Sequence, residues 1–231
     1  MNLATEFPSK EEIARGYDQL GTHLSMPPKY HRRCARLMRR HLRPGMAVAD
    51  LGCGHGGLLR ELRLLDSTLK LSAIDLSPVR VNNARERVPD AEVRVGDIEA
   101  LPFANAAFEA AFATEVMEHL PDPVKALREI WRVLKPGSWL LVSLPNRDWF
   151  HFDDYQASRI RFQPVDDHFY RVGEFEAILG RAGFKINKVR GGENLYFGGG
   201  LPRLLERLAL LLYPPLHRRM KRMIFVAQKV V

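Results

Sequence analysis

Cysteine is scarce in this 231-residue sequence, and no hydrophobic run is long enough to span a membrane. Cys34 and Cys53 form no CxxC pair, which argues against a disulfide framework or a structural zinc site. No apolar stretch approaches the ~18 residues that a transmembrane helix needs. Residues 1–19 also lack the apolar core of a signal peptide. We therefore expect a cytoplasmic protein without a metal site.

The composition is that of a folded domain with an excess of positive charge. Hydrophobic residues make up 46% of the chain and charged residues 27%, which allows one sizeable core and argues against wholesale disorder. The net charge is +8. Such a charge favours nucleic acid, an anionic membrane surface or an acidic substrate as partner, and the charge alone does not choose between them.

Apolar strand-like runs alternate with amphipathic helical runs along most of the chain. This order predicts an α/β fold, with a mostly parallel sheet covered by helices. The expected strands are Met46–Leu51, Leu69–Ile74, Ala91–Val95, Phe108–Ala113, Trp139–Leu144, Phe184–Val189 and Arg222–Lys229. The expected helices are Pro28–Leu42, Ser77–Val88, Leu58–Leu65, Pro123–Leu134 and Val172–Ala182. The long segment 191–221 between the last two strands is interpreted as an insertion.

A glycine-rich loop follows the first expected strand, in the segment Asp50–Gly56. Glycines let a backbone turn tightly and approach a ligand, and the helix that follows offers free N–H groups. The spacing of its glycines also fits the dinucleotide pattern GxGxxG, so a nicotinamide-dependent oxidoreductase is an alternative. Asp50 argues against it, because a carboxylate at the strand tip would repel a pyrophosphate. That carboxylate suits a cofactor with an ammonium and a sulfonium group.

Two further carboxylates follow the next two expected strands. Asp75 ends the second strand, where an acid can accept hydrogen bonds from both hydroxyls of a ribose. Asp97 follows the third strand next to Ile98, where a carboxylate can accept a bond from an adenine amino group while the apolar side chain covers the ring. The three acids together indicate an adenosyl cofactor.

The order of these motifs resembles the class I S-adenosylmethionine (SAM) methyltransferases. The series continues with Leu101–Phe103, Glu115–Leu120 and Arg132–Gly137, and the resemblance covers residues 44–190. It is strongest with the branch that contains quinone-biosynthesis and small-molecule methyltransferases. It implies a Rossmann-like seven-stranded sheet with an antiparallel last strand and helices on both faces. It also implies SAM as the cofactor. By this resemblance the cofactor-binding residues are Asp50, Gly52, Cys53, Gly54, Asp75, Leu76, Asp97, Ile98, Thr114 and Glu115.

Two histidines are candidate general bases, although methyl transfer from a sulfonium has no universal catalytic residue. His119 follows the fourth strand, and His168 precedes the helix after the fifth. Methylation of base amino groups is disfavoured, because 114–117 lacks the Asn/Asp-Pro-Pro-aromatic tetrad. Methylation of cytosine C5 is disfavoured as well, since neither cysteine fits that chemistry. Other RNA acceptors stay open.

The expectations about the acceptor and the partners are based on the two terminal parts of the chain. Residues 1–43 are expected to form a helical lid over a methyltransferase domain of residues 44–231, with Tyr17 and Tyr30 close to the cofactor. Within 201–222, leucines at helical spacing precede a basic run, a pattern that serves peripheral membrane contact, a homodimer contact or a cap over the pocket. We expect methyl transfer to a small, lipophilic acceptor. The alternatives are an RNA methyltransferase and a non-catalytic SAM-binding accessory protein at the membrane.

Overall fold

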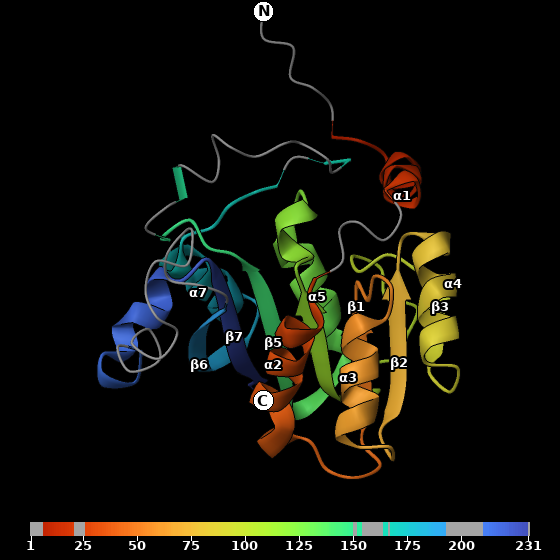
Figure 1. Ribbon diagram of the computed structural model, residues 1–231, viewed down its shortest axis with the longest axis horizontal. Helices are drawn as coiled ribbons and strands as arrows, with labels where there is room; N and C mark the ends of the chain where they lie inside the picture. Colours follow the sequence, from red (N-terminus) through yellow and green to blue (C-terminus); the bar gives the residue numbers. More distant parts are fainter. Residues whose placement is uncertain are drawn as a thin grey trace, which may run out of the picture.

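A seven-stranded sheet forms the centre of the described protein, in the order β3-β2-β1-β4-β5-β7-β6 (Figure 1). The computed structural model describes residues 7–20, 26–149, 152–153, 164–165, 167–192 and 210–230. The strands are β1 (Ala47–Leu51), β2 (Lys70–Asp75), β3 (Glu92–Val95), β4 (Phe108–Thr114), β5 (Leu134–Pro145), β6 (Phe184–Gly192) and β7 (Arg222–Lys229). Only β7 runs antiparallel to its neighbours. The predicted fold is confirmed.

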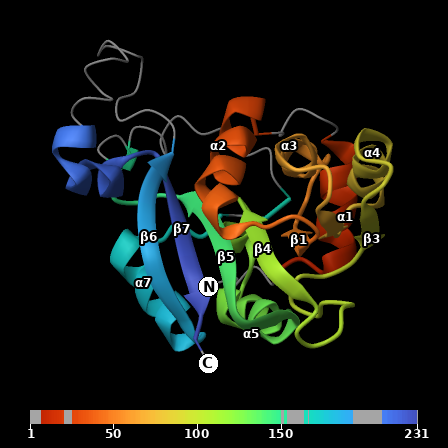
Figure 2. The same cartoon turned by 90° about the horizontal axis from the view of Figure 1, so that it is seen from below.

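Helices cover both faces of this sheet (Figure 2). They are α1 (Lys10–Gln19), α2 (Pro28–Met38), α3 (Gly57–Leu65), α4 (Pro78–Arg87), α5 (Pro123–Val133) and α7 (Val172–Arg181). Val48 joins the hydrophobic core beneath α2, α3 and α4, whereas Ala49 and Leu51 join the core beneath α5 and α7. Since the central strands β1 and β4 are buried on both faces, their sequences are mostly apolar rather than alternating, whereas the edge strand β3 is mostly exposed.

Local capping explains where two helices begin. Ser77 Oγ accepts a hydrogen bond from Arg80 N (3.0 Å), and Pro78 occupies the first turn, as the sequence predicts for α4. Ser9 and Glu12 form a capping box at the start of α1. The helices predicted from the sequence do not include α1, because its apolar stripe is short and most of its residues are polar. Ile13 and Tyr17 form that stripe and are buried.

The boundary between α5 and β5 differs from the prediction. The pair Pro136–Gly137 does not separate the two elements, because α5 ends at Val133 and β5 begins at Leu134. Leu134 pairs with Phe108, and the register then shifts before Ala110 pairs with Trp139. The Pro–Gly pair lies within this irregularity, with Gly137 at φ 73°. An irregular strand tolerates both residues where a regular one would not.

The insertion expected at 191–221 is shorter than predicted, because part of this range belongs to regular structure. Gly191 and Gly192 extend β6, and Pro214–Arg219 forms the 3₁₀ turn η3. Of the leucines in 201–212, those at 201–208 lie outside the described residues. Within the described chain, no helix has the length and apolar content needed to cross a membrane.

Candidate functional site

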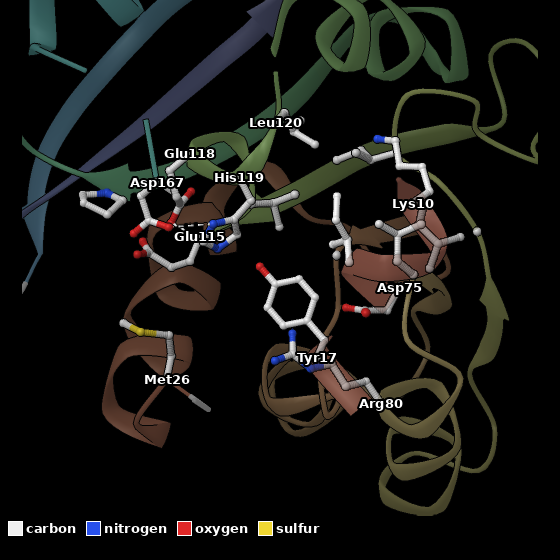
Figure 3. Close-up of a pocket in the computed structure, with 18 of the residues that line it drawn as sticks. Lys10, Tyr17, Met26, Asp75, Arg80, Glu115, Glu118, His119, Leu120 and Asp167 are labelled. Carbon is white, nitrogen blue, oxygen red and sulfur yellow. Dashed lines mark ion pairs between the residues drawn. The ribbon is translucent and has the colours of Figure 1, made fainter. Parts of the chain in front are cut away.

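A cavity of about 370 Å³ lies at the carboxyl ends of the strands, beneath α1 (Figures 1 and 3). Its lining comes from α1, the loops after β1 to β5, and the start of β7: Lys10, Ile13, Tyr17, Met26, Gly52, Ile74, Asp75, Leu76, Arg80, Gly96, Ile98, Glu115, Val116, Glu118, His119, Leu120, Pro145, Asp167 and Arg222. Its glycine-loop end comprises Gly52, Asp75, Gly96 and Ile98. Its acidic end comprises Glu115, Glu118 and Asp167, which group together in Figure 3. The ligand space therefore joins two chemically different ends.

The loop after β1 requires glycine at its first position. Gly52 has φ +81°, and a Cβ there would lie 2.3 Å from Val116 Cγ2. Gly54 has φ +50°, with no neighbouring atom where its Cβ would be. The N–H groups of Gly52 and Cys53 both donate to Ile74 O at 2.9 Å. These bonds fix the loop against β2 and leave its open side toward the cavity.

Asp75 connects this loop to the start of α4. Its Oδ2 accepts a hydrogen bond from Gly54 N (2.8 Å), and its Oδ1 accepts one from Ser77 N (3.0 Å). A carboxylate offers about four acceptor positions, so two bonds leave capacity for ligand hydroxyls. Asp75 can therefore organise the loop and bind a ribose at the same time.

Asp50 is a buried carboxylate without a hydrogen-bond partner among the described residues. It is 1% exposed. Burial, with a smaller effect from the carboxylate of Asp75, raises the pKa of Asp50 to about 8. An unpaired buried carboxyl next to a ligand loop fits a ligand with a cationic group, which would restore its charge compensation.

Lys10 of α1 reaches the carboxylates that follow β3. Its Nζ donates to Glu99 Oε2 at 2.6 Å and lies 3.4 Å from Asp97 Oδ1. Asp97 also accepts a hydrogen bond from Glu99 N (2.9 Å). Gly96 and Ile98 line the cavity on either side of Asp97, whose own side chain does not. The first helix is thus held to the glycine-loop end by charge.

Tyr17 and Asp18 fix the other end of α1. The guanidinium of Arg80 lies 4.1 Å from the centre of the Tyr17 ring, and Ser77 Oγ donates a hydrogen bond to Asp18. The Tyr17 hydroxyl has no hydrogen-bond partner within the described chain, and burial raises its pKa. A buried hydroxyl inside the cavity is a donor available to a ligand.

Glu115 anchors the acidic end. It follows β4 with φ 56°, an uncommon value for a residue with a side chain. Its Oε1 accepts hydrogen bonds from Tyr30 Oη (2.8 Å) and Ser143 Oγ (3.1 Å), and its Oε2 pairs with Arg222. Elements far apart in the sequence therefore meet at one carboxylate, which explains how this backbone conformation is held.

His119 lies between two carboxylates of the acidic end. Its Nδ1 is 2.9 Å from Asp167 Oδ1, and its Nε2 is 3.9 Å from Glu118 Oε1. Glu118 is 2% exposed, and its Oε2 has no hydrogen-bond partner within the described residues. Burial raises the pKa of Glu118 well above its usual range, and the charges of Glu115 and Asp167 add to this. The contact with Asp167 is short enough for an ion pair although its two atoms do not have hydrogen-bond geometry, and the histidine lines the cavity beside two acids.

The structure brings only part of the expected residue set to the cavity wall. Gly52, Asp75, Leu76, Ile98, Glu115 and His119 line the cavity. Asp50, Cys53, Gly54, Asp97, Thr114 and His168 do not. His168 N donates to Glu118 O at 2.7 Å, and its ring packs 4.5 Å from that of Tyr170, which places it behind the acidic end. Tyr30 also lies outside the lining but reaches it through Glu115.

Several lining residues escaped the sequence-based prediction. Asp167 and Arg222 belong to segments far from β4 in the sequence, and no local pattern indicates that they meet there. Lys10 and Arg80 are surface-type residues whose role depends on the position of α1. Glu118 had a usable signal, because it directly precedes the candidate base His119.

Several proteins with similar sequences are named as methyltransferases. Residues 49–142 match the family described as "Methyltransferase domain". The chain is 35% identical to the ubiquinone biosynthesis O-methyltransferase of Xanthomonas axonopodis pv. citri over 64% of this chain and 66% of that protein. It is 37% identical to the 2-methyl-6-phytyl-1,4-hydroquinone methyltransferase of a Synechocystis species over 50% of this chain and 36% of that protein. Against three of its curated relatives, the chain spans less than half of the relative's length.

Similar solved structures share the whole architecture. A Haloferax volcanii methyltransferase in complex with the Trm112 methyltransferase activator superposes with a TM-score of 0.68, at 21% identity. The match covers 97% of this chain and 98% of that one. At this identity, the likeness concerns the fold, including the strand order that places the cavity at the carboxyl ends of the strands.

Proposed function

We propose that this chain, which belongs to the class I SAM-dependent methyltransferases and uses SAM as its cofactor, transfers a methyl group to a small, lipophilic acceptor. The observation that carries the proposal is one cavity with two ends. The glycine-loop end suits an adenosyl group, and the acidic end combines polar groups with the apolar side chains of Met26, Val116 and Leu120. A polar group and apolar walls together fit an acceptor with one reactive group on a hydrophobic body.

The residues at the glycine-loop end fit the cofactor. Asp75 would hold the ribose hydroxyls, and the unpartnered carboxyl of Asp50 would compensate the positive charge of the methionine part. Ile98 would cover the adenine ring. Asp97 would accept from its amino group after its side chain, which lies beside Lys10 outside the cavity wall, turned inward. When bound, SAM supplies a methyl group that its sulfonium charge has already activated.

The residues at the acidic end would position and deprotonate the acceptor. We propose His119 as the general base, because its Nδ1 faces Asp167 at 2.9 Å and its ring lines the cavity. Asp167 would orient the imidazole and stabilise the imidazolium that forms when a proton is taken. His168, the second candidate, is proposed only as a support for the backbone of Glu118.

The acceptor class is supported by relatives that are named for quinone-related substrates. The Xanthomonas protein is named for ubiquinone biosynthesis, and the Synechocystis protein for a phytyl hydroquinone. We propose action in the cytoplasm, where the two buried cysteines would stay free thiols. Peripheral membrane contact through 201–222 is part of the proposal, with a homodimer contact as the other use of that segment. Nucleic acid is not the proposed partner.

Two measurements test this function in order. Calorimetry with SAM should give one site per chain, and mass spectrometry of small molecules that co-purify with the protein should identify a lipophilic acceptor. That acceptor should gain 14 mass units with SAM, about the mass of one CH₂, as expected for methyl transfer. Failure to bind SAM would overturn the cofactor assignment. SAM binding without turnover of any extracted metabolite would favour the accessory protein, and methylation of RNA alone would overturn the lipophilic acceptor.

A further inference from the structure

The described surface carries a second feature that the cavity does not use, a group of cations along α2, the 3₁₀ turn η1 (Arg39–His41) that follows it, and the edge strand β6. This arginine face comprises Arg33, Arg36, Arg39, Arg40, Arg43, Lys188 and Arg190. Both α2 and η1 contact β6, because Arg33 donates a hydrogen bond to Gly191 O and Arg40 Nη2 donates to Asn187 Oδ1 at 3.3 Å. Arg36, Leu37, Arg39, Arg40 and Lys188 surround an open hollow between them.

No carboxylate of the described chain forms an ion pair with these cations, although Asp and Glu pair with many other basic residues of the protein. The cations therefore act on one another. Arg190 and Arg40 contribute to a lowered pKa of Lys188, and Arg33 and Arg40 to a lowered pKa of Arg190, in each case after burial as the main cause. Such mutual repulsion destabilises the folded protein unless anions lie close by.

Exposed apolar side chains adjoin the arginine face. The turn η3 packs on the end of β6, where His217 Nδ1 accepts a hydrogen bond from Gly191 N (3.3 Å). Directly before η3, Leu211 is 74% exposed, Leu212 79% and Tyr213 61%. Figures 1 and 2 both show β6 between α2 and the blue segment that holds these three residues. Cations beside protruding apolar groups are the pattern of a protein that lies on an anionic membrane.

We propose that the arginine face docks on the surface of a bilayer containing anionic phospholipids, with the hollow around Arg36, Arg39 and Lys188 taking lipid phosphate groups and Leu211 and Leu212 entering the interface. This inference rests on the membrane contact that the proposed function assigns to 201–222, and it extends that contact to α2, η1 and β6 and names its lipid class. It also gives each side of α2 a separate role. The Tyr30 side of α2 reaches the cavity through Glu115, so a membrane on the opposite side would hold the cavity close to a lipophilic acceptor.

The test uses vesicles and variants of matched charge. Arg36→Gln, Arg39→Gln and Lys188→Gln are combined, because these side chains make no hydrogen bond within the described protein. Lys125→Gln, Arg128→Gln and Arg181→Gln form the control, since these exposed cations lie on α5 and α7 across the sheet. Sedimentation is measured with vesicles of phosphatidylcholine alone and with about 30% phosphatidylglycerol.

We expect the natural protein to bind only the anionic vesicles, and the first triple variant to bind them roughly a hundredfold more weakly. The control variant should lose at most about a few fold, through its net charge. Leu211→Ser combined with Leu212→Ser should weaken binding by about tenfold without changing the preference for anionic lipid. Relief of repulsion should leave the melting temperature of the first variant equal or higher.

Three outcomes would overturn the proposal. One is equal binding of the natural protein to both kinds of vesicle, or to neither. Another is an equal loss of vesicle affinity in the two triple variants, which would show that only the net charge of the protein matters and not the position of these cations. The last is tight, salt-dependent binding to RNA that needs the arginine face, in a protein that does not bind the vesicles. None of these outcomes bears on SAM binding or methyl transfer, so failure of this inference is distinguishable from failure of the proposed reaction.

Discussion

The two ends of the cavity are built in opposite ways. At the glycine-loop end, Gly52, Asp75 and Ile98 follow β1, β2 and β3 in chain order, and adjacent parallel strands bring the three loops together. At the acidic end, the side chains of Glu115, Asp167 and Arg222 come from segments separated by long stretches of sequence. One end is a local consequence of strand order. The other exists only after the whole sheet, including antiparallel β7, has assembled.

This difference predicts separable effects of substitution at the two ends. The glycine-loop end should control cofactor affinity, and the acidic end should control the rate of transfer. The largest expected effect on cofactor affinity is that of Asp75→Ala. It leaves the N–H groups of Gly54 and Ser77 without acceptors and removes the proposed ribose contact. We expect SAM affinity to fall by roughly a hundredfold to a thousandfold, since two ribose hydrogen bonds to a charged group are lost, each of about 1.5–2 kcal/mol.

Asp75→Asn is the matched control, because it keeps one acceptor oxygen in the same volume. Its affinity for SAM in calorimetry should lie between those of the natural protein and the alanine variant. Unchanged affinity in the alanine variant would show that the loop binds no ribose, and the two ends would lose their proposed division of roles.

At the acidic end, His119→Asn should lower kcat by about a hundredfold to ten-thousandfold, as expected for loss of a general base. SAM affinity should change by no more than about threefold, because the ring is not part of the glycine-loop end. His168→Asn is the control, since that ring lies outside the cavity wall. Single-turnover rates with the acceptor and separate SAM titrations distinguish the two parameters. Equal losses of kcat in both variants would remove His119 from the proposed role.

The same difference explains what the sequence predicts and what it does not. The glycine loop, Asp75 and Ile98 are predictable, because short-range patterns of strand, turn and helix determine their positions. The meeting of Tyr30, Arg222 and Glu115 depends on the packing of α2 and β7, and no periodicity encodes it. Even at the predictable end, Asp50 was expected beside the ligand but is buried behind the cavity wall, since its strand is covered on both faces.

Asp50 gives the glycine-loop end a dependence on pH. In the cofactor-free protein its pKa is raised to about 8, so it is largely protonated at neutral pH. A cationic ligand favours the ionised form, so SAM binding below pH 8 should release a proton. Affinity should then rise with pH, by at most about tenfold per pH unit, and level off above about pH 8. Calorimetry in buffers of different ionisation enthalpy measures the released proton directly.

The stability of the folded protein depends on pH in the opposite direction to the affinity for SAM. Because the folded pKa of Asp50 lies above its ordinary value of 3.8, the folded form holds the proton more tightly than the unfolded form. The contribution of Asp50 to the free energy of unfolding is therefore largest below about pH 3.8. It declines as the pH rises and is lost above about pH 8. Asp50→Asn should abolish this loss and the proton release together. Proton release that persists in the Asn variant would assign the linkage to another group.

The smallest expected effect concerns α1, the helix that lies over the glycine-loop end. Lys10→Met removes the ion pair that holds α1 to Glu99, a carboxylate with a side chain only 5% exposed. Because the lysine itself is 32% exposed, solvent screens the pair, and a contribution of about 1 kcal/mol or less is expected. Dissociation of SAM should therefore be about threefold to fivefold faster, as each 1.4 kcal/mol corresponds to a factor of ten.

Arg15→Met is the control on the same helix, where Arg15 is exposed and makes no hydrogen bond to the rest of the described chain. It should leave the dissociation rate unchanged, measured by stopped-flow displacement of SAM. The rate of methyl transfer at saturating SAM should stay the same in both variants, because the ion pair of Lys10 lies at the glycine-loop end, whereas α1 meets the acidic end through Tyr17, whose ring lies 6.0 Å from that of His119. If Lys10→Met instead slowed the transfer step, loss of the ion pair would have to reach His119 through Tyr17, and the two ends of the cavity would be coupled by α1.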